Sequence, residues 1–497
     1  MFSLLAGGIA KIFSLSVFPF LAMGIVGGII IGALPGLSAT MGVAVLLPLT
    51  FGMSPDPAMA VLIGIYIGAI YGGSISAILL KTPGTPAAAA TVLDGYQMAD
   101  KGEAGRALAI AASASFVGGM VSTVVLITVA PTLAQFALRF SGPEYFALAV
   151  FGLTIIAGIS GDHPLKGLMA GMLGLFIATI GLDPVTTYPR FTFGQLDLYN
   201  GLSVIPVLIG LFALSEAFVQ LENLLDDEKS GAPRTFKHGG LSLKEFFHLL
   251  PTMLKCGLIG SGIGAIPGAG ADIAAFVCYN EARRSSKDPE KFGTGIPEGI
   301  AAPESGNNGV TGGAMVPLLT LGVPGDAVTA ILLGALVIQG IQPGPLLFTE
   351  NASTAYGIFA SLMVGNALML LCGLLGVRLF CRVVEIPKKF IIPTIIVLSL
   401  VGSYAMGNNT FDIWVCLVFG IIGYFMQRVK MPASPVILAV ILGPMAESNL
   451  RRAVMMYEGS YSFLWTRPIT IAFLAMSALS LYSAYNRTKK ARLKNNG

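Results

Sequence analysis

The stretch that decides the fold is Ile31-Gly-Ala-Leu-Pro35-Gly36-Leu-Ser38-Ala39-Thr40, because a close copy lies in the other half of the chain. That copy is Ile263-Gly-Ala-Ile-Pro267-Gly268-Ala-Gly270-Ala-Asp272. In both copies a Pro-Gly pair follows an apolar run. Proline cannot extend a helical hydrogen-bond ladder but suits a helix start, and glycine lets the backbone approach a ligand closely. Each copy therefore predicts a broken helix.

A second pair of motifs follows the first pair in the same order. Thr82-Pro83-Gly84-Thr85-Pro86 in the first half corresponds to Val323-Pro324-Gly325-Asp326-Ala327 in the second half, after separations of similar length. Two motifs that recur in order are hard to explain by composition alone. The chain is therefore predicted to contain an internal repeat.

The basic residues of the two halves are distributed in opposite ways. Residues 41–80, between the first half's motifs, contain no Lys or Arg, whereas Lys101 and Arg106 follow its second motif. In the second half the inter-motif segment carries Arg283, Arg284, Lys287 and Lys291, and residues 339–356 carry none. Cytoplasmic loops are enriched in Lys and Arg, so equivalent loops are expected on opposite sides of a membrane. This is the pattern of inverted-topology repeats.

The composition requires a membrane. Of the 497 residues 54% are apolar and only 11% charged, with a mean hydropathy of +0.78, whereas a soluble protein carries roughly 25% charged residues. We predict an all-α polytopic membrane protein with broken or re-entrant helices and about 10–14 membrane segments. Apolar runs lie near 12–34, 41–52, 57–80, 107–138, 144–161, 164–182, 201–221, 249–266, 310–323, 326–341, 355–377, 390–406, 411–427, 433–446 and 468–485.

Several of these runs are too short to cross a bilayer alone, because a crossing needs about 20 residues. Those that end at Gly-Pro clusters are interpreted as re-entrant helices. The run 12–34 resembles a signal peptide, but its length and the lack of an A-x-A-like exit favour a first span.

Four regions are predicted along the chain. Residues 1–221 form the first membrane repeat, 222–248 a polar connection, and 249–430 the second repeat. Residues 431–497 form C-terminal membrane segments and a basic tail that is expected in the cytoplasm.

Residues beside the predicted helix breaks are the candidates for binding, since free helix N-termini near the midplane hold substrate and ions in transporters of this kind. The alternative is simple kinking with N-caps. The candidate substrate-binding residues are Pro35, Gly36, Ser38, Ala39, Thr40, Lys81, Pro83, Gly84, Thr85, Pro267, Gly268, Gly270, Asn307, Asn308, Pro324 and Gly325. The candidate coupling-ion residues are Asp272, Glu304, Asn308 and Asp326.

Two charged candidates have clear alternatives. Glu304, with Asn307 and Asn308, stands in a Gly-rich stretch just before an apolar segment, and an ionisable group at membrane depth suggests function. The alternative is a loop residue at the interface. Lys81, directly before a helix break, is suited to neutralising an anionic group of a substrate, but snorkelling to the interface is equally compatible with its position.

Other polar residues point to no further chemistry. The three histidines, His163, His238 and His248, lack the spacing of a zinc site, and the five cysteines form no C-x-x-C pair. Neither a catalytic residue nor an organic cofactor is predicted, and the only metal ion expected is Na⁺. Asp162, His163 and Lys166 are assigned to a short turn between spans that Pro164 marks. Nothing suggests nucleic acid.

The motifs resemble those of one family, the large membrane subunit of the tripartite tricarboxylate transporters. The resemblance covers roughly residues 17 to 430. It rests on the stretches 32–40 and 82–91, on Asp94-Gly-Tyr96 with Lys101-Gly-Glu-Ala-Gly-Arg-Ala107, and on Glu298-Gly-Ile-Ala-Ala-Pro-Glu-Ser-Gly-Asn-Asn308. Two departures concern the substrate: Ser305-Gly306 replaces a common small apolar pair, and Lys81 replaces an uncharged polar residue.

The resemblance implies a secondary transporter subunit that takes up a tricarboxylate or other carboxylate with Na⁺ or H⁺. It further implies a bacterial cytoplasmic (inner) membrane, a small four-span membrane subunit and a periplasmic solute-binding protein as partners. A homodimer is also considered.

Rival functions remain open from the residues alone. A carboxylate channel uses similar Gly-rich re-entrant loops, and a membrane enzyme would require a nucleophile, base or metal constellation that scattered Ser, Thr and His do not supply. An ATP-driven permease would need another chain, because no P-loop occurs. Inverted repeats favour alternating access, and the helix-tip geometry favours an elevator motion over rocking.

Overall fold

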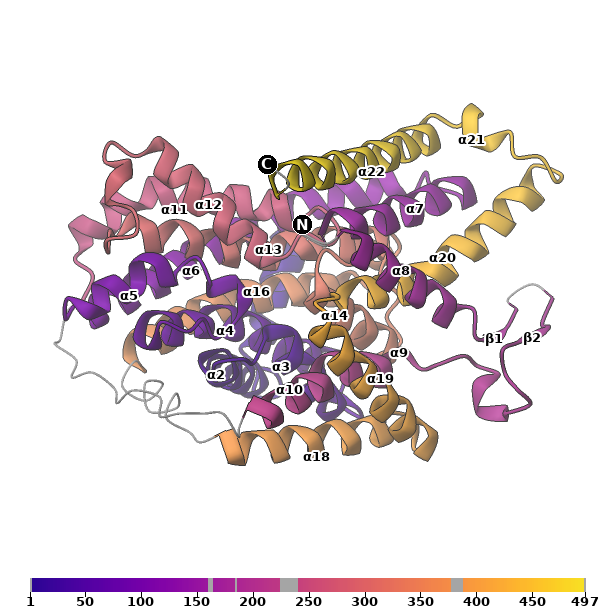
Figure 1. Cartoon of the computed structure of the whole chain (residues 1–497), viewed down its shortest axis with the longest axis horizontal. Coiled ribbons are helices and arrows are strands. Elements are labelled where there is room, and N and C mark those ends of the chain that lie inside the picture. Colours follow the sequence, from indigo (N-terminus) through magenta and orange to yellow (C-terminus); the bar gives the residue numbers. More distant parts are fainter. Residues whose placement is uncertain (1, 160–163, 184–185, 224–239, 377–387, 496–497) are drawn as a thin grey trace. The chain divides into compact units, whose positions relative to one another are not determined.

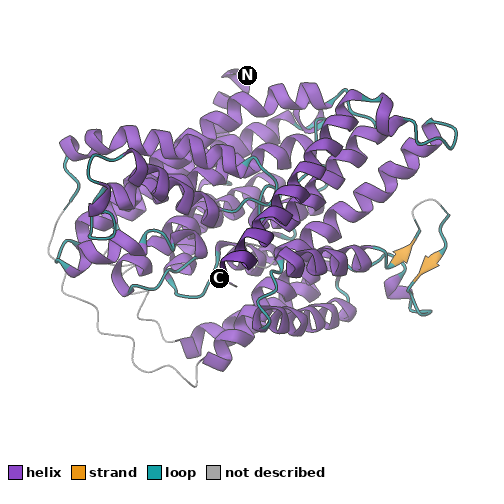
Figure 2. Cartoon of the chain, turned by 45° about the horizontal axis from the view of Figure 1, so that its top comes forward, coloured by secondary structure: helices purple, strands orange, loops and turns teal. Residues whose placement is uncertain are grey.

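The computed structural model describes residues 2–159, 164–183, 186–223, 240–376 and 388–495. Within these ranges nearly all elements are helices, and the only strands are the two-residue β1 (Gly181–Leu182) and β2 (Pro189–Arg190) of one small hairpin (Figure 2). The prediction of an all-α polytopic membrane protein is confirmed. Six described helical segments are long and apolar enough to cross a membrane: Pro55–Leu80, Ala104–Ala137, Val204–Glu222, Leu243–Gly264, Ala352–Leu375 and Thr410–Arg428.

The chain forms two compact units, and each unit takes pieces from both halves of the sequence. Unit 1 contains residues 1–134 and 216–398, and unit 2 contains residues 135–215 and 399–497. These units divide the chain differently from the predicted repeats, whose boundaries stay a prediction. Most of the predicted polar connection lies outside the described residues.

Unit 1 carries all four Pro-Gly motifs. Its elements, of which the longer ones from α2 onward are labelled in Figure 1, are α1 (Phe2–Ile12), α2 (Phe18–Ala33), α3 (Ala39–Leu46), η1 (Leu47–Thr50), α4 (Pro55–Leu80), η2 (Pro86–Ala88), α5 (Val92–Asp100), most of α6 (Ala104–Ala137) and of α10 (Ser215–Asn223), α11 (Leu243–Gly264), α12 (Ala271–Ser285), η5 (Pro289–Lys291), α13 (Glu298–Leu321), α14 (Ala327–Ile338), α15 (Leu347–Glu350), α16 (Ala352–Leu375) and the first part of α18 (Lys388–Gly407).

Helices α2 and α4 pack backbone to backbone along a stripe of glycines. A Cβ atom added at Gly28 would lie closer than 3.0 Å to the backbone of Ile65, and one at Gly32 would lie as close to the backbone of Ala69. Small residues repeated every four positions allow this close approach, as in membrane helix pairs generally. Because the partner numbers rise together along both helices, α2 and α4 run parallel.

The second half repeats this pairing with α11 and α13. A Cβ added at Gly260 would meet the backbone of Gly306, and one at Gly264 would meet that of Val310. These helices are therefore parallel as well. In both halves a short helix, α3 or α12, lies between the parallel partners in the sequence and returns the chain, which confirms the predicted broken helices.

The contacts between α4 and the region of α13 show that these two helices run in opposite directions. Ser74, near the end of α4, contacts Glu304 near the start of α13, whereas Tyr66, earlier in α4, contacts Asp326 beyond the end of α13. The two equivalent helices therefore run antiparallel. This order agrees with inverted repeats.

Unit 2 is a helical unit with the small hairpin. Helix α7 (Gly142–Ile159) packs against α20 (Ser434–Met456) and α22 (Pro468–Asn495), and α20 also packs against α8 (Pro164–Ala178). Its other elements are η3 (Leu196–Leu198), α9 (Val204–Leu208), the π-helical segment η4 (Ile209–Leu214), the end of α18, α19 (Thr410–Arg428) and α21 (Phe463–Thr466).

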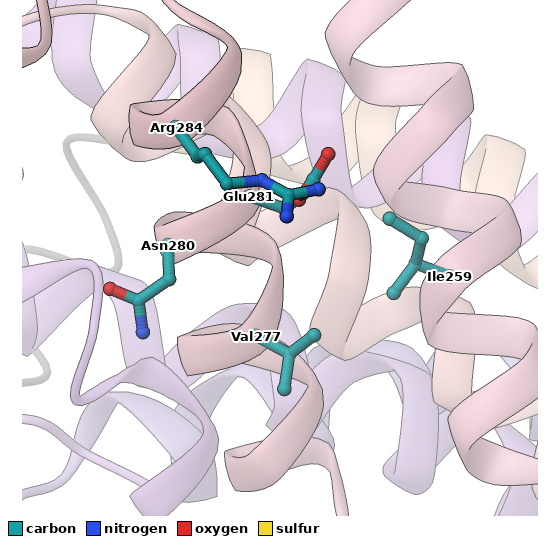
Figure 3. Close-up of a pocket in the computed structure, with 5 residues that line it drawn as sticks. All are labelled: Ile259, Val277, Asn280, Glu281 and Arg284. Atoms are coloured by element: carbon teal, nitrogen blue, oxygen red, sulfur yellow. Dashed lines mark ion pairs between the residues drawn. The ribbon is translucent and has the colours of Figure 1, made fainter.

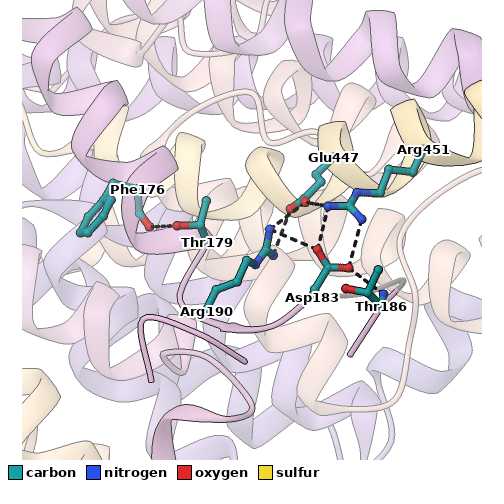
Figure 4. Close-up of polar contacts among 7 residues, drawn as sticks. All are labelled: Phe176, Thr179, Asp183, Thr186, Arg190, Glu447 and Arg451. Atoms are coloured by element: carbon teal, nitrogen blue, oxygen red, sulfur yellow. Dashed lines mark hydrogen bonds and ion pairs between the residues drawn. The ribbon is translucent and has the colours of Figure 1, made fainter. Parts of the chain in front are cut away.

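Ion pairs fasten the hairpin to α20 (Figure 4). Arg190 of β2 donates to Glu447 at 2.8 Å, and Arg451 donates to Asp183 at 2.7 Å and to Glu447 at 2.8 Å. The hydrogen bond to Glu447 raises the pKa of the Arg190 guanidinium. The charges of two cations and two anions thus neutralise one another, and the cluster holds the hairpin against α20.

Three sequence-based boundaries need correction. The first predicted run corresponds to α2, which begins at Phe18 with Pro19 in its first turn, and the separate helix α1 precedes it. Helix α13 begins at Glu298, well before the predicted run 310–323, so the Glu304 stretch lies inside a helix. Lys166 lies on α8 and donates to the Val429 carbonyl at 2.6 Å, while Asp162 and His163 lie outside the described residues.

Candidate functional site

The first break in each half places the start of a short helix behind a Pro-Gly turn. After α2, Pro35 and Gly36 turn the chain with a Gly36 φ of +88°, and Ser38 caps α3 by accepting from the Met41 N–H at 3.1 Å. Ala39 and Thr40 form the first turn of α3. The left-handed φ explains the glycine, because a side chain is strained there.

The corresponding turn after α11 has the same geometry. Gly268 follows Pro267 with φ +81°, and Gly270 is the N-cap of α12. The Gly268 N–H donates to the Gly325 carbonyl at 2.5 Å, so the two motifs of the second half meet directly. Asp272 lies in the first turn of α12 with its side chain exposed.

The second breaks are also equivalent. Lys81 ends α4 with φ +60°, and Gly322, which likewise stands two residues before the motif's proline, ends α13 with φ +69°. Behind them Gly84 and Gly325 touch the ends of α2 and α11: an added Cβ would meet the Gly32 carbonyl in one half and the Gly264 carbonyl in the other. Pro83 and Pro324 precede these contacts.

The short helices that follow the breaks in one half pack against those of the other half, each first-break helix against the element after the other half's second break. Helix α12 of the second half packs on η2 of the first, and α14 of the second packs on α3 of the first. Asn307 of α13 also donates to the Ala87 carbonyl of η2 at 3.1 Å. The structure thus brings the four predicted breaks together within unit 1.

A buried carboxylate stands beside this meeting point. The Glu304 side chain is fully buried in α13 and accepts from the hydroxyls of Ser74 at 2.8 Å and Ser115 at 3.1 Å, and also from that of Thr91. These donors come from α4, α6 and the segment before α5. A carboxylate surrounded by hydroxyls at depth has the chemistry of a Na⁺ or proton site.

Two nearby motif residues have buried oxygens without a hydrogen-bond partner. The Asn308 Nδ2 donates to Asn307 Oδ1 at 2.7 Å, but its own Oδ1 has no partner, and neither has Thr85 Oγ1. Both side chains are buried, and an unpaired buried oxygen is costly unless an ion, water or ligand satisfies it. These oxygens fit a cation or a substrate hydroxyl.

Asp326 has a different environment from Glu304. One of its oxygens accepts from the Thr329 N–H at 2.8 Å in a capping box, and the other accepts from the Tyr66 hydroxyl at 2.6 Å. Both oxygens are therefore occupied. The geometry gives Asp326 the work of fixing the start of α14 and joining it to α4.

Lys81 is exposed, and its ammonium lies over the Tyr96 ring, 5.4 Å from the centroid. Ser305, the other residue that departs from the family pattern, points away from Glu304. Its hydroxyl donates to the Met253 carbonyl of α11 at 2.5 Å. Ser305 therefore fixes helix packing and does not join the hydroxyls around Glu304.

Sequence reasoning missed the hydroxyl donors Ser74, Thr91 and Ser115. Single hydroxyls in long apolar runs were the available signal, but many such residues only bond their own helix backbone. It also missed the role of Asp94, a fully buried carboxylate that accepts from Tyr279 Oη at 2.8 Å and from the Gly295 N–H at 2.7 Å. That cradle fixes the loop before α13.

Comparisons with known proteins identify similar sequences. The family model described as the tripartite tricarboxylate transporter TctA family matches residues 18–438. An uncharacterized 52.8 kDa protein in the TAR-I ttuC' 3' region of Agrobacterium vitis is 39% identical over 454 residues, which is 91% of this chain and 90% of that protein. An uncharacterized protein in the TAR-II ttuC' 3' region of the same organism is 37% identical over 225 residues, 45% of this chain and 93% of that protein. No solved structure matches.

Proposed function

Because the chain belongs to the TctA family of tripartite tricarboxylate transporters, we propose that it is the permease subunit for cation-coupled uptake of a carboxylate. In this proposal a periplasmic solute-binding protein delivers the carboxylate, and a small four-span subunit completes the complex in a bacterial inner membrane. Na⁺ or H⁺ supplies the coupling, and citrate is the first substrate to test.

The observation that carries the proposal is the convergence of four helix breaks beside a buried carboxylate. Free N–H groups at the starts of α3 and α12 suit anionic oxygens, because helix N-termini carry partial positive charge. Glu304 and the unpaired oxygens of Asn308 and Thr85 suit a cation. A bound cation and a bound carboxylate would partly neutralise each other's charge.

The division into units supports an elevator motion. Unit 1 holds every candidate binding residue, and unit 2 holds none of them. We propose that unit 1 moves as a body and carries the site between the two sides of the membrane. A cross-link between the units that left uptake intact would contradict this motion.

The test is uptake of labelled citrate and a panel of di- and monocarboxylates into vesicles that contain this chain and the small subunit. Binding protein and a Na⁺ or pH gradient are added or omitted separately. Gradient-driven accumulation that needs the binding protein would support the proposal. Equilibration without a gradient would indicate a channel, and no uptake of any carboxylate would refute the substrate class.

A further inference from the structure

A groove between α11 and α12 lies apart from the residues proposed to bind substrate. It has a volume of about 360 Å³ and is lined by Ile259 of α11 and by Val277, Asn280, Glu281 and Arg284 of α12 (Figure 3). The two helices are antiparallel neighbours, since Lys255 contacts Glu281 and Cys256 contacts Cys278. The groove therefore lies between the two arms of a helical hairpin.

Polarity changes along this groove at the same level on both helices. Lys255 of α11 bonds Glu281 of α12 at 2.7 Å, so these two charges mark one level. The next level, one helical turn closer to the hairpin tip, is apolar on both helices. It is formed by Ile259 on α11 and Val277 on α12. A bilayer interface has such a gradient, with polar headgroups on one side of the boundary and hydrocarbon on the other.

The surrounding face is apolar and exposed. Helix α11 is a candidate membrane span with only 33% of its apolar window buried. Leu258 on α11 is 57% exposed, and Phe276 on α12 is 44% exposed. Side chains of this kind are covered by lipid in a membrane protein. The apolar end of the groove, at Ile259 and Val277, is therefore a place for an acyl chain.

The polar rim carries a net positive charge. Glu281 pairs with both Lys255 and Arg284, at 2.7 and 2.8 Å, so one cationic charge of the three-residue set is left over. The Arg284 side chain is 80% exposed, and its guanidinium has donors left for a further anion. Guanidinium groups bind phosphate with two parallel hydrogen bonds.

We propose that this groove is a binding site for an anionic phospholipid of the cytoplasmic leaflet. The headgroup phosphate binds at Arg284 with support from Lys255, and an acyl chain lies over Ile259 and Val277. The leaflet follows from the basic loop after α12, which the positive-inside rule places in the cytoplasm. This inference stands whether or not the carboxylate is identified correctly.

The experiment is native mass spectrometry of the purified full chain with equal amounts of phosphatidylglycerol and phosphatidylcholine in detergent. The wild-type protein should retain phosphatidylglycerol at least about fivefold over phosphatidylcholine, the preference expected from one basic side chain at an anionic surface. Arg284→Gln should remove most of this preference while leaving the Lys255–Glu281 pair in place. Val277→Trp should lower phosphatidylglycerol retention by filling the groove.

Arg452→Gln, which removes an exposed arginine from α20 in unit 2, is the matched control and should keep the wild-type preference. Size-exclusion profiles check that each variant is folded. Equal retention of the two lipids by the wild-type protein overturns the proposal without any variant. A wild-type preference that survives Arg284→Gln, or loss of bound lipid when the small subunit is co-purified, also overturns it, the latter by assigning the groove to a protein partner.

Discussion

At the end of α4 the residue with a left-handed backbone is Lys81, whereas at the equivalent end of α13 it is Gly322. Glycine adopts this conformation freely, but lysine carries a Cβ atom and is strained there by roughly 1 kcal/mol. The same backbone turn is thus made by the expected residue in one half and by a charged residue in the other. Strain of this kind is retained where a side chain has a function, which favours the hypothesis that Lys81 contacts substrate.

In the helices before these turns, the charged residue is in the second half instead of the first. Glu304 stands five residues before Gly309 of the α13 glycine stripe, and the position five residues before Gly68 of the α4 stripe is Ile63. In the same alignment Asp326 corresponds to Thr85. The halves share a backbone plan, but neither of these two carboxylates has a counterpart at the equivalent position of the first half. The repeat therefore supplies the scaffold, and its divergence supplies the chemistry.

The largest effect is expected from Glu304→Gln. Replacing the carboxylate by an amide removes the buried negative charge while keeping its size, so coupled uptake should fall by about a hundredfold, the upper end of the loss caused by removing a group that supports a bound metal ion. Vesicle uptake under a cation gradient measures it. The neighbour Ser305→Ala, whose hydroxyl faces α11, should lose far less. Equal losses in the two variants would mean that only helix packing had been tested.

Alanine at the close-contact glycines tests the shared scaffold. Gly84→Ala and Gly325→Ala each place a methyl group against backbone, which should cost about 1–3 kcal/mol of stability. Gly84→Ala should be the more damaging, because its Cβ would approach the Gly32 carbonyl more closely. Thermal unfolding of purified protein is the readout. Gly27→Ala on α2 has open space and serves as control; a similar loss there would remove the close-contact explanation.

Two substitutions at Lys81 separate charge from strain. Lys81→Gly copies the residue found at Gly322, so it should stabilise the turn by about 1 kcal/mol while removing the ammonium. Lys81→Met removes the ammonium and keeps the strain. Both variants should raise the substrate concentration for half-maximal uptake by several-fold, and only Lys81→Gly should raise the melting temperature. Unchanged half-saturation in both would assign Lys81 to the interface.

The smallest effect is expected in unit 2. Arg190→Gln removes the 2.8 Å ion pair with Glu447, and a longer one of 3.6 Å with Asp183, from the cluster on α20, where the arginine is partly exposed. Such a pair contributes about 0–1 kcal/mol, so stability should change by less than that and uptake should stay at the wild-type level. A large loss of uptake would show that the fastening of the hairpin matters for transport.

Several features of the site followed from residue order. The Pro-Gly motifs at Pro35 and Pro267 predicted two helix breaks, and both are present because proline and glycine act through their own backbone geometry. The buried environment of Glu304 was harder to predict. Its stretch looks polar and glycine-rich, yet it lies inside α13, where close packing requires Gly306 against α12 and Gly309 against α11. Composition left a loop at the interface open as the alternative, and tertiary packing decided for a helix.

The sequence by itself determined the membrane class, the repeat and the positions of the breaks, since hydropathy, charge bias and Pro-Gly geometry are local or additive properties. Tertiary structure alone decided which hydroxyls meet Glu304 and which residue meets Asp326. It also decided that the two halves contribute to both compact units. Those contacts join residues more than 180 positions apart, and a pairing over such distances is set by how whole helices pack, which no local pattern encodes.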